Sequence, residues 1–520
     1  MGSSKSKNDA ILVLDFGGQY CHLIGRGIRK EGVYSEILPC DIAANKLLKI
    51  GDRLNIKGLV LSGGPASVYE KDSPQLDPDM LDLNIPMLGL CYGHQLIAHL
   101  FGGRVEKSSK REYGLTHVTI DRPSDLLQGL EREETVWMSH SDTVYSLPDD
   151  FEVLAHTENC PIAAFRHRRR PLYGVQWHPE VVHTKRGNTV LRNFIFNICK
   201  CEANWRPTYM VEKAIDEIRS VVGEKKAIIA LSGGIDSSTA AILAAKAIGK
   251  NLIAIFVDHG FMREGEPEYV EETFKKLGVN IVVNNARERF FKKLENVTDP
   301  ERKRKIIGRE FIKVFEEAAK NTGSEYLIQG TIYPDRIESG TMKHSEKIKS
   351  HHNVAGLPTR IRFKAIIEPL RDLYKDEVRE IARSLGLPHE IVYRQPFPGP
   401  GLAVRIIGKI TRERVEVLRR ADKIVAEEIE GCGELKSTLW QYFAVLTDTK
   451  STGVRGDARA YGYVLAIRVV ESREAMTANF ARIPYDILEK ISTRITNEIP
   501  QITRVVYDIT HKPPSTIEWE

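Results

Sequence analysis

Short apolar runs recur along most of the chain, and each is followed by a glycine-containing turn and a helical pattern. Examples are Ile11–Leu14, Gly58–Leu61, Ala227–Leu231 and Leu252–Val257. Runs that are apolar throughout, without polar alternation, are typical of strands buried on both faces of a parallel sheet. The alternation of such strands with helices therefore predicts α/β folds with mostly parallel sheets over residues 11–198 and again over residues 227–395.

Two short segments interrupt this alternation and mark domain boundaries. The first runs from Cys201 to Pro207, and the second is Pro396–Gly401, where three prolines and two glycines would break a helix or strand. Beyond the second segment, a helical pattern is followed by strand-like runs, which predicts a small α+β domain. The expected parts are a flexible leader at 1–10, domains at 11–203 and 204–400, and a C-terminal domain at 401–520 with a helix at 411–430 and strands at 440–447, 461–470 and 502–509.

The composition is that of an ordinary globular protein. Of the 520 residues, 42% are hydrophobic and 28% are charged, which supplies several cores and excludes a mainly disordered chain. The net charge of +5 is too small to indicate nucleic-acid binding, although it suits anionic small molecules. Because the seven cysteines show no regular framework, we expect reduced thiols and a cytoplasmic protein.

Neither the hydropathy pattern nor the amino terminus predicts a stable membrane association. No apolar stretch approaches the ~18 residues that a membrane-spanning helix needs. Gly2 and Ser6 fit the N-myristoylation pattern M-G-x-x-x-[ST], with Lys5 and Lys7 beside them. A single acyl chain at Gly2 would anchor the protein only weakly. We therefore expect a disordered polar leader, with N-myristoylation left open.

A cysteine lies where a buried strand turns sharply into a helix. Cys91 stands between Gly89 and Gly93, which is the nucleophile-elbow arrangement with cysteine in place of serine. The following helix N-terminus favours a thiolate. Taken alone, this pattern favours a buried structural cysteine over a nucleophile. However, His178 ends another apolar strand with Glu180 two residues later, which can supply a general base and its orienting carboxylate.

A second glycine-rich segment follows the strand at 227–231. It reads S-G-G-I-D-S-S from Ser232 to Ser238 and leads into an alanine-rich helix. Glycines let the backbone approach an anion, hydroxyls donate hydrogen bonds, and a helix N-terminus attracts phosphate. The G-K-[ST] ending of a Walker A loop is absent. A serine- and glycine-rich turn with a good helix cap is the structural alternative.

The first of these patterns resembles a known family. Residues 11–198 resemble a class I glutamine amidotransferase domain, in which a Cys-His-Glu triad releases ammonia from glutamine. The resemblance implies that Cys91 is the nucleophile, His178 the base and Glu180 its orienting partner. It places the oxyanion hole at Gly63 and the backbone of Tyr92, and a substrate contact at Gln95.

The second pattern resembles the loop of the N-type ATP pyrophosphatases. This resemblance implies that residues of the loop bind ATP and that AMP is transferred to a substrate oxygen, with Asp236 as a plausible Mg²⁺ ligand. The pairing with an amidotransferase makes chemical sense, because adenylation converts a poor oxide leaving group into AMP, which ammonia can displace. The loop residues are Ser232, Gly233, Gly234, Ile235, Asp236, Ser237 and Ser238.

Four further segments resemble the glutamine-hydrolysing GMP synthetases, so that the resemblance extends over the chain from residue 11 onward. These segments are Gly330–Ser339, Ile348–Asn353, Pro396–Gly401 and Lys512–Glu520. The resemblance implies two doubly wound, mostly parallel-sheet α/β domains, followed by a small α+β C-terminal dimerisation domain that completes the site for xanthosine monophosphate (XMP). The implied substrates are XMP, ATP and glutamine, the cofactor is Mg²⁺, and the assembly is a homodimer.

Individual residues of these segments acquire roles only through the resemblance. Asp335 and Glu338 match carboxylates at the ATP–Mg²⁺ site, and Lys349 and His351 match a mobile lid, with Lys349 in a catalytic role. We expect this lid to be disordered without ligand. Without the resemblance, the carboxylates could be a helix N-terminal pair and the lid a solvated loop. The implied XMP-binding residues are Arg263, Gln441, Asp457, Lys512 and Glu518.

Three prominent features are expected to carry no chemistry. The basic run Arg166–Arg170 is expected at the exposed tip of a hairpin and not in a nucleic-acid site, and Glu301–Lys305 is expected to be a solvated helix start. Cys199 and Cys201 have no second pair nearby in sequence, so zinc binding is not expected.

Three other functions compete with GMP synthesis. A tRNA-thiolating adenylase would want a cysteine pair near the 232–238 loop, but Cys432 is the only cysteine beyond Cys201. A NAD synthetase would use a different glutaminase. A nucleotide sensor with decayed sites is disfavoured because the triad, Asp236 and Lys349 are intact.

Overall fold

The computed structural model describes residues 7–123, 125–338, 363–436, 438–472 and 477–520. The chain divides into two compact units. The first contains the chain up to Arg206, and the second contains Pro207–Arg336 and the described chain from residue 363 onward. The leader with Gly2 lies mostly outside the described residues, as do Lys349 and His351.

The first unit is built on a nine-stranded sheet in the order β2-β1-β3-β4-β9-β8-β7-β5-β6. The five strands from β2 to β9 pair in parallel, as the uninterrupted apolar runs predict. All seven residues of β1 are buried. These parallel strands are β1 (Asp9–Asp15), β2 (Tyr34–Pro39), β3 (Asn55–Leu61), β4 (Met87–Leu90) and β9 (Leu172–Val175).

The other half of this sheet is antiparallel, and the apolar runs did not distinguish it from the parallel half. Its strands are β5 (Arg104–Ile120), β6 (Glu133–Ser146), β7 (Phe151–His156) and β8 (Ala164–His167). The basic run falls on the connection between β8 and β9, which pair antiparallel, and Arg168–Arg170 are exposed. The prediction of an exposed hairpin tip is therefore confirmed.

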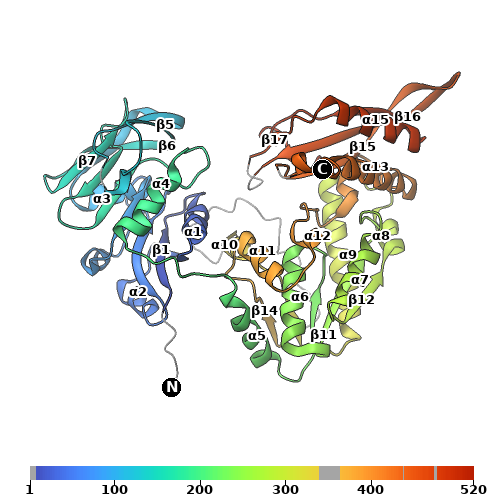
Figure 1. Ribbon diagram of the computed structural model, residues 1–520, viewed down its shortest axis with the longest axis horizontal. Helices are drawn as coiled ribbons and strands as arrows, with labels where there is room; N and C mark the ends of the chain where they lie inside the picture. Colours follow the sequence, from blue (N-terminus) through green and yellow to red (C-terminus); the bar gives the residue numbers. More distant parts are fainter. Residues whose placement is uncertain (1–6, 124, 339–362, 437, 473–476) are drawn as a thin grey trace. The chain divides into compact units, whose positions relative to one another are not determined.

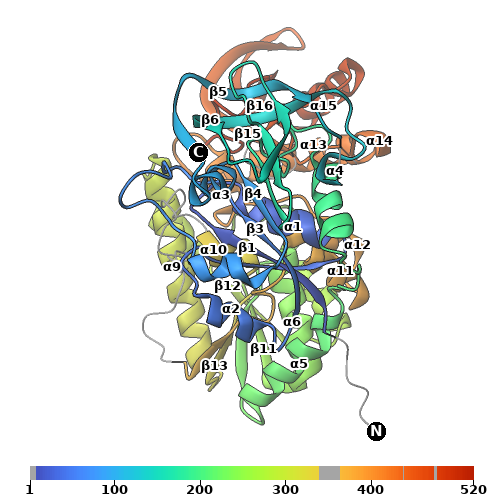
Figure 2. The ribbon, with the colours of Figure 1, turned by 90° about the vertical axis from the view of Figure 1, so that its left-hand side faces the viewer.

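Helices flank the strands of the first unit. Helix α3 packs on β4 and β3, while α1 packs on β1 and β2, and Figure 2 shows both beside these strands. The apolar core beneath them includes Leu12, Leu59 and Leu96, each fully buried. The helical segments are α1 (Cys21–Lys30), α2 (Ala44–Ile50), η1 (Pro78–Leu83), α3 (Tyr92–Leu100), η2 (Asp125–Leu127), α4 (Gly187–Arg192) and the π-helical η3 (Asn193–Ile198).

The second unit contains a five-stranded sheet in the order β12-β11-β10-β13-β14, and every pairing is parallel. The strand order reverses direction at β10, so this is a doubly wound sheet whose switch point lies between β10 and β13. Ligands bind such sheets at the carboxyl ends of the strands at this point. The strands are β10 (Ala227–Ala230), β11 (Leu252–Asp258), β12 (Ile281–Asn285), β13 (Tyr326–Ile328) and β14 (Ala365–Ile367).

Helices pack along this sheet, with α5 and α11 both against α6, and α9 on β11 (Figure 1). The first turns of α9 contain the predicted solvated run Glu301–Lys305, but one residue contradicts that prediction. Lys303 is fully buried, and its ammonium donates to the Ile406 carbonyl oxygen at 2.6 Å and pairs with Glu520. The segments are α5 (Tyr209–Val222), α6 (Ile235–Ile248), η4 (Gly249–Asn251), α7 (Glu266–Lys276), α8 (Arg287–Leu294), α9 (Pro300–Lys320), α10 (Tyr333–Glu338), α11 (Lys375–Ser384) and α12 (His389–Val392).

The C-terminal part contains a four-stranded sheet, and α13 and α15 pack on its strands (Figure 1). Strands β15 and β17 pair antiparallel with β16, whereas β18 pairs parallel with it. Helix α13 packs on β15 and α15 on β18. The elements are η5 (Gly401–Arg405), α13 (Arg412–Glu430), α14 (Gly433–Lys436), β15 (Gln441–Arg455), β16 (Ala458–Glu471), β17 (Asn479–Phe480), α15 (Tyr485–Glu498) and β18 (Ile502–Tyr507).

The architecture confirms the predicted α/β fold with its additional α+β part. Within the second unit, a single apolar core contains Ile228 and Leu327 from the parallel sheet together with Leu418, Leu465 and Ile491 from the C-terminal part. The division of this unit at residue 400 stays a prediction. Within the described ranges, no helix combines the length and apolarity that crossing a membrane requires.

Candidate functional site

The chain turns sharply at Cys91, between β4 and α3. Cys91 has φ 51° and ψ −103°, a conformation that residues with side chains rarely adopt. The turn is tight enough that a Cβ on Gly89 would lie 2.4 Å from Gly93 C, and a Cβ on Gly93 would lie 2.4 Å from Leu61 O. Both glycines are therefore required by close backbone approach, and the cysteine is held at the start of a helix.

The predicted base and its partner lie next to this cysteine. His178 Nδ1 is 2.8 Å from Glu180 Oε1, and the two side chains are 6% and 1% exposed. Gly63 touches both His178 and the cysteine, since a Cβ on Gly63 would lie 3.0 Å from His178 Cε1 and 3.6 Å from Cys91 Cβ. The structure thus brings together four of the residues predicted for this site.

Charge interactions at His178 favour the imidazolium. Burial lowers the pKa of His178, but the charges of Glu180 and Cys91 outweigh burial and hold that pKa well above its ordinary value. A buried imidazolium between a carboxylate and a thiolate is the arrangement expected of an activated cysteine nucleophile.

Gln95 belongs to a hydrogen-bond chain beside the nucleophile. Its Nε2 donates to the Asp142 carbonyl oxygen at 2.8 Å and to Gln176 Oε1 at 3.1 Å. Gln176 Nε2 lies 3.7 Å from Cys91 Sγ. Tyr92, whose predicted role is that of its backbone N–H, begins α3, and its side chain donates to the Pro74 carbonyl oxygen at 2.6 Å.

The serine- and glycine-rich loop occupies the switch point of the second sheet, between β10 and α6. Ser232 Oγ and Ser237 Oγ are 2.9 Å apart, and Ser237 Oγ donates to the Gly234 carbonyl oxygen at 3.1 Å. Gly233 has a φ of 74°, which favours glycine. Gly330, after β13, packs so closely that a Cβ there would lie 2.8 Å from Ser237 N. The loop is thus a closed turn at a helix N-terminus, with the form of a phosphate-binding nest.

One carboxylate of this loop has an oxygen available for a ligand. Asp236 lies in the first turn of α6, and its Oδ2 pairs with the Lys375 ammonium. Its Oδ1 is buried, and no described residue gives it a hydrogen bond. A buried, unpartnered carboxylate oxygen beside a phosphate-binding turn has the chemistry that Mg²⁺ prefers.

The other predicted ATP–Mg²⁺ residues are only partly described. Asp335 lies in the first turn of α10, where its Oδ2 accepts a hydrogen bond from the Ile332 N–H at 3.1 Å. Glu338 ends the same helix, but its side chain is outside the described residues. The predicted lid residues Lys349 and His351 also lie outside the described residues. The expected disorder of the lid therefore stays a prediction.

Several predicted XMP-binding residues meet around two arginines. Glu518 forms two hydrogen bonds with Arg405, at 3.0 and 2.9 Å, and Gln441 Nε2 lies 3.4 Å from Glu518 Oε1. The guanidinium carbons of Arg263 and Arg405 lie 4.5 and 5.2 Å from the centre of the Phe397 ring. Arg263, Gln441 and Glu518 are therefore brought together.

Burial opposes the charge of both arginines, but the acidic neighbours outweigh it only at Arg405. Burial lowers the pKa of Arg263, although Asp422 raises it. At Arg405 burial also opposes the charge, but Glu518 raises the pKa above its ordinary value. Arg263 Nη2 is buried without a hydrogen-bond partner among the described residues, which leaves a cationic donor for an anionic ligand.

The two other predicted XMP residues belong to other segments of the C-terminal part. Lys512 pairs through its backbone with Ala478, at N–O distances of 2.7 and 3.1 Å. Asp457 is exposed at the turn between β15 and β16, at the opposite end of the hairpin from Gln441. Because β15 has 15 residues, the two residues are separated by on the order of 40 Å along the strand. One chain therefore does not bring Asp457 to Gln441.

Sequence reasoning missed residues that act beside the predicted ones. Lys375 and Arg405 lie in segments whose local sequence pattern does not indicate a binding site. Each contacts a predicted site residue only in the folded chain, Lys375 with Asp236 and Arg405 with Glu518. Phe397 was within the proline-rich segment, but that segment was interpreted as a boundary. Gln176 could have been noticed, because it lies two residues before His178 at the end of the same apolar strand.

Three family models match consecutive parts of the chain. "Glutamine amidotransferase class-I" matches residues 12–198, "PP-loop domain" matches residues 207–391, and "GMP synthase C terminal domain" matches residues 427–519. The first match contains Cys91, His178 and Glu180, and the second contains Asp236.

Curated relatives match the chain over its whole length. A "GMP synthase [glutamine-hydrolyzing]" of Caldicellulosiruptor saccharolyticus is 54% identical over 99% of this chain and 100% of its own length. Proteins of the same name from Acetivibrio thermocellus and Clostridium perfringens are 55% and 52% identical, over 99% and 98% of this chain and 100% of their own lengths. The chain therefore belongs to the family of glutamine-hydrolysing GMP synthases.

Proposed function

We propose that Cys91, His178 and Glu180 form the glutaminase triad of this ATP-dependent ligase, which uses glutamine to synthesise GMP. Cys91 Sγ attacks the side-chain carbonyl carbon of glutamine, and His178 protonates the departing ammonia to leave a cysteinyl thioester. Water, deprotonated by His178, then hydrolyses the thioester to glutamate. Glu180 keeps the imidazole oriented and compensates its charge. The 2.8 Å contact between His178 and Glu180, next to the strained turn at Cys91, is the observation that supports this assignment.

The same site provides groups for the developing oxyanion and for the substrate. We assign the oxyanion hole to the backbone N–H groups of Gly63 and Tyr92, because Gly63 abuts Cys91 and Tyr92 begins the helix that follows it. Gln95 would contact the glutamine substrate from the buried start of α3.

In the second unit, we assign ATP binding to the loop Ser232–Ser238. The C2 oxygen of XMP attacks the α-phosphorus of ATP, and pyrophosphate leaves. Ammonia then attacks C2, and AMP departs with that oxygen, giving GMP. The turn at the N-terminus of α6 would hold the departing pyrophosphate through backbone N–H groups and serine hydroxyls.

Asp236 is the residue of this loop best suited to hold Mg²⁺, through its buried Oδ1. Asp335 and Glu338 would join it on the strength of the family resemblance. Bound there, the ion would neutralise phosphate charge during nucleotidyl transfer. Lys375, paired with Oδ2, keeps the carboxylate of Asp236 oriented toward the loop.

We assign XMP binding to the group formed by Arg263, Gln441 and Glu518. Arg263 offers an unpartnered guanidinium nitrogen to the 5′-phosphate, while Glu518 and Gln441 offer polar atoms to the purine or ribose. Lys512 would reach the same ligand from the C-terminal segment. Asp457 can join this pocket only as a contribution from a second chain, since its own hairpin holds it away from Gln441.

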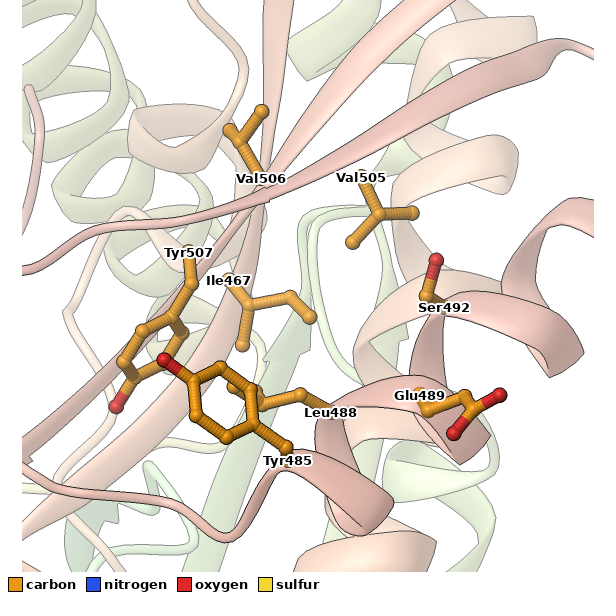
Figure 3. Close-up of a pocket in the computed structure, with 8 residues that line it drawn as sticks. All are labelled: Ile467, Tyr485, Leu488, Glu489, Ser492, Val505, Val506 and Tyr507. Atoms are coloured by element: carbon orange, nitrogen blue, oxygen red, sulfur yellow. The ribbon is translucent and has the colours of Figure 1, made fainter.

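We also propose that the C-terminal sheet mediates a homodimer. Val454 and Tyr461, on the β15–β16 hairpin, are 74% and 71% exposed, and Ile509, beyond β18, is 64% exposed. Figure 3 shows a groove in which Tyr485 and Leu488 of α15 face Tyr507 of β18. Exposed apolar side chains on one small sheet support a self-association surface. Sedimentation of the wild type and of Val454→Asp tests this, with a monomeric wild type contradicting the proposal.

The proposed domains are an amidotransferase at 11–203, an adenylating domain at 204–400 and a C-terminal dimerisation domain at 401–520. All seven cysteines are free. Free thiols throughout the chain support a cytoplasmic location, where thiols are kept reduced.

An isotope experiment tests the adenylation step. XMP carrying ¹⁸O at the C2 position is converted in the presence of ATP, Mg²⁺ and glutamine, and the AMP product is analysed by mass spectrometry. The proposal predicts one ¹⁸O in the phosphate of AMP. Label recovered in inorganic phosphate or in water would contradict adenylation at C2.

A further inference from the structure

A buried polar cluster lies beside the glutaminase site, and the mechanism above does not use it. It consists of Glu112 on β5, His140 on β6, and Thr157 and Cys160, all of which are buried. Ligand-type atoms of Glu112, His140 and Cys160 lie within 4.8 Å of one another. A carboxylic acid and a histidine that are buried this deeply need hydrogen-bond or charge partners.

The hydrogen bonds of His140 engage both of its ring nitrogens. Nδ1 lies 2.9 Å from the Asp142 carbonyl oxygen, and Nε2 lies 3.1 Å from Glu112 Oε2. Because a carbonyl oxygen and a carboxylate oxygen are both acceptors, both ring nitrogens are placed to donate. Glu112 Oε1 accepts a further hydrogen bond from Thr157 Oγ1 at 2.8 Å. Burial opposes ionisation of Glu112, but the hydrogen bonds from His140 and Thr157 lower its pKa, and its contact with His140 has the geometry of an ion pair.

Cys160 takes no part in this ion pair. Burial and the nearby Glu112 charge raise the pKa of Cys160 to about 12, so it stays a neutral thiol. A metal ion would require the thiolate and would have to displace the direct contact between His140 and Glu112. The geometry therefore favours a hydrogen-bonded ion pair over a metal site.

The carbonyl held by His140 is shared with the glutaminase site. Asp142 O accepts from His140 Nδ1 and also from Gln95 Nε2 at 2.8 Å. A backbone carbonyl can only accept, so it fixes the orientation of the Gln95 amide: the nitrogen faces β6, and the oxygen is left for a donor on the substrate. The same stretch of β6 carries the Ser139 carbonyl oxygen, 3.7 Å from Cys91 Sγ.

The β5–β6 ladder is irregular at this point. Lys107 pairs with Asp142, but the next paired residues are Glu112 and His140. Residues 108–111 form an insertion on β5, so regular backbone pairing is lost where β6 passes the nucleophile. The Glu112–His140 ion pair joins β5 and β6 at the edge of this interruption.

We propose that Glu112 and His140 are positioning residues of the glutaminase reaction. Their ion pair holds the Asp142 carbonyl, and this carbonyl orients Gln95 for substrate glutamine. The inference rests on the proposed function of the triad, since Gln95 matters only if glutamine binds beside Cys91.

Two substitutions of His140 separate positioning from mere packing. His140→Asn keeps a donor at the place of Nδ1, and so keeps the bond to Asp142 O. His140→Gln keeps a donor at the place of Nε2, and so keeps the bond to Glu112. We expect His140→Gln to raise KM for glutamine about tenfold with a smaller change in kcat, whereas His140→Asn raises it clearly less. Equal effects would overturn the proposal.

Glu112→Gln and Cys160→Ala complete the test. Glu112→Gln keeps a hydrogen-bond acceptor for His140 but removes the carboxylate charge, so it is expected to raise KM for glutamine about threefold, which is less than the effect of His140→Gln. Cys160→Ala removes a buried side chain of the same cluster that makes none of these bonds, and it should leave KM unchanged. GMP formation with ammonium should stay at the wild-type rate in every variant. A Cys160→Ala effect equal to that of Glu112→Gln, or zinc bound stoichiometrically by the wild type and lost in Cys160→Ala, would overturn the proposal.

The ammonium assay also separates two kinds of failure. If the wild type makes GMP from ammonium but not from glutamine, the proposed function fails. If the wild type uses glutamine and Glu112→Gln has the wild-type KM, only the positioning role fails. If Glu112→Gln does not fold, the comparison of KM for glutamine between His140→Asn and His140→Gln still tests the positioning role.

Discussion

His178 Nδ1 and Glu180 Oε1 are joined by a 2.8 Å hydrogen bond between two almost fully buried side chains. Burial alone would lower the His178 pKa, but Glu180 and Cys91 raise it well above the ordinary value. The imidazolium, and with it the ion pair to Glu180, is therefore present below the raised pKa of His178 and is lost as the pH rises through it.

Glu180→Gln removes the charge that contributes most to this upward shift. The alkaline limb of glutaminase kcat/KM should then move to lower pH, and kcat should fall by about 10²-fold because the base is less well oriented. A pH profile of glutamate release, with ammonium-dependent GMP synthesis as the control for folding, measures this. An alkaline limb that stays in place would show that Glu180 does not set the His178 pKa.

Asp236→Asn should impair the ATP-dependent reaction and not glutamine hydrolysis, which is the reverse of the effect expected for Glu180→Gln. An amide oxygen is an uncharged and therefore weaker cation ligand than the carboxylate Oδ1, and the amide also loses the ion pair with Lys375. We expect AMP formation to fall by about 10²-fold with glutamine and with ammonium alike. Higher Mg²⁺ should restore part of this loss. Near-normal AMP formation, with an unchanged requirement for Mg²⁺, would remove Asp236 from the assigned role.

Arg405→Lys tests the link between Arg405 and Glu518. Lysine keeps the positive charge but cannot form two parallel hydrogen bonds, which here measure 3.0 and 2.9 Å. Glu518 would lose its fixed orientation, so KM for XMP should rise about tenfold while KM for ATP changes less than about twofold. Initial rates at varied XMP and ATP give both constants. Equal increases in both would indicate general damage to the second unit.

Alanine substitutions at Gly401 and Gly399 provide a matched test of how close packing at a glycine affects stability. Gly401 has a φ of 63°, and a Cβ there would lie 2.3 Å from Phe261 O, whereas a Cβ on Gly399 would meet nothing within 4 Å. Gly401→Ala should destabilise the fold by about 1–3 kcal/mol through strain and overpacking. Gly399→Ala should be close to neutral. Thermal unfolding of both variants tests this, and equal midpoints would be inconsistent with the observed close approach.

The sequence was most informative where function demands unusual local chemistry. The glycines around Cys91 predicted a tight turn, and the structure shows positive φ and backbone contacts that leave no room for side chains. The 232–238 loop likewise lies where an apolar strand that the sequence predicts leads into a helix. In both places the residues that suggest the chemistry are consecutive in the sequence, so a local pattern is enough to predict the turn.

Long-range contacts could not be predicted in this way. Lys303 is in a run of charged residues that reads as solvated, yet it is fully buried because the distant Glu520 and the Ile406 carbonyl oxygen compensate its charge. The proline-rich segment before Gly401 reads as a linker, although Phe397 packs under two arginines. Burial of polar residues depends on partners that only the tertiary fold supplies.

The central claim is that one site releases ammonia and a separate site uses it. The most direct test measures AMP and GMP formed from XMP, ATP and Mg²⁺, with either glutamine or ammonium, in the wild type and in Cys91→Ala. We predict that Cys91→Ala loses the glutamine-dependent reaction and keeps the ammonium-dependent reaction at the wild-type rate. A Cys91→Ala protein that still makes GMP from glutamine, or one that loses both reactions while remaining folded, would contradict the account.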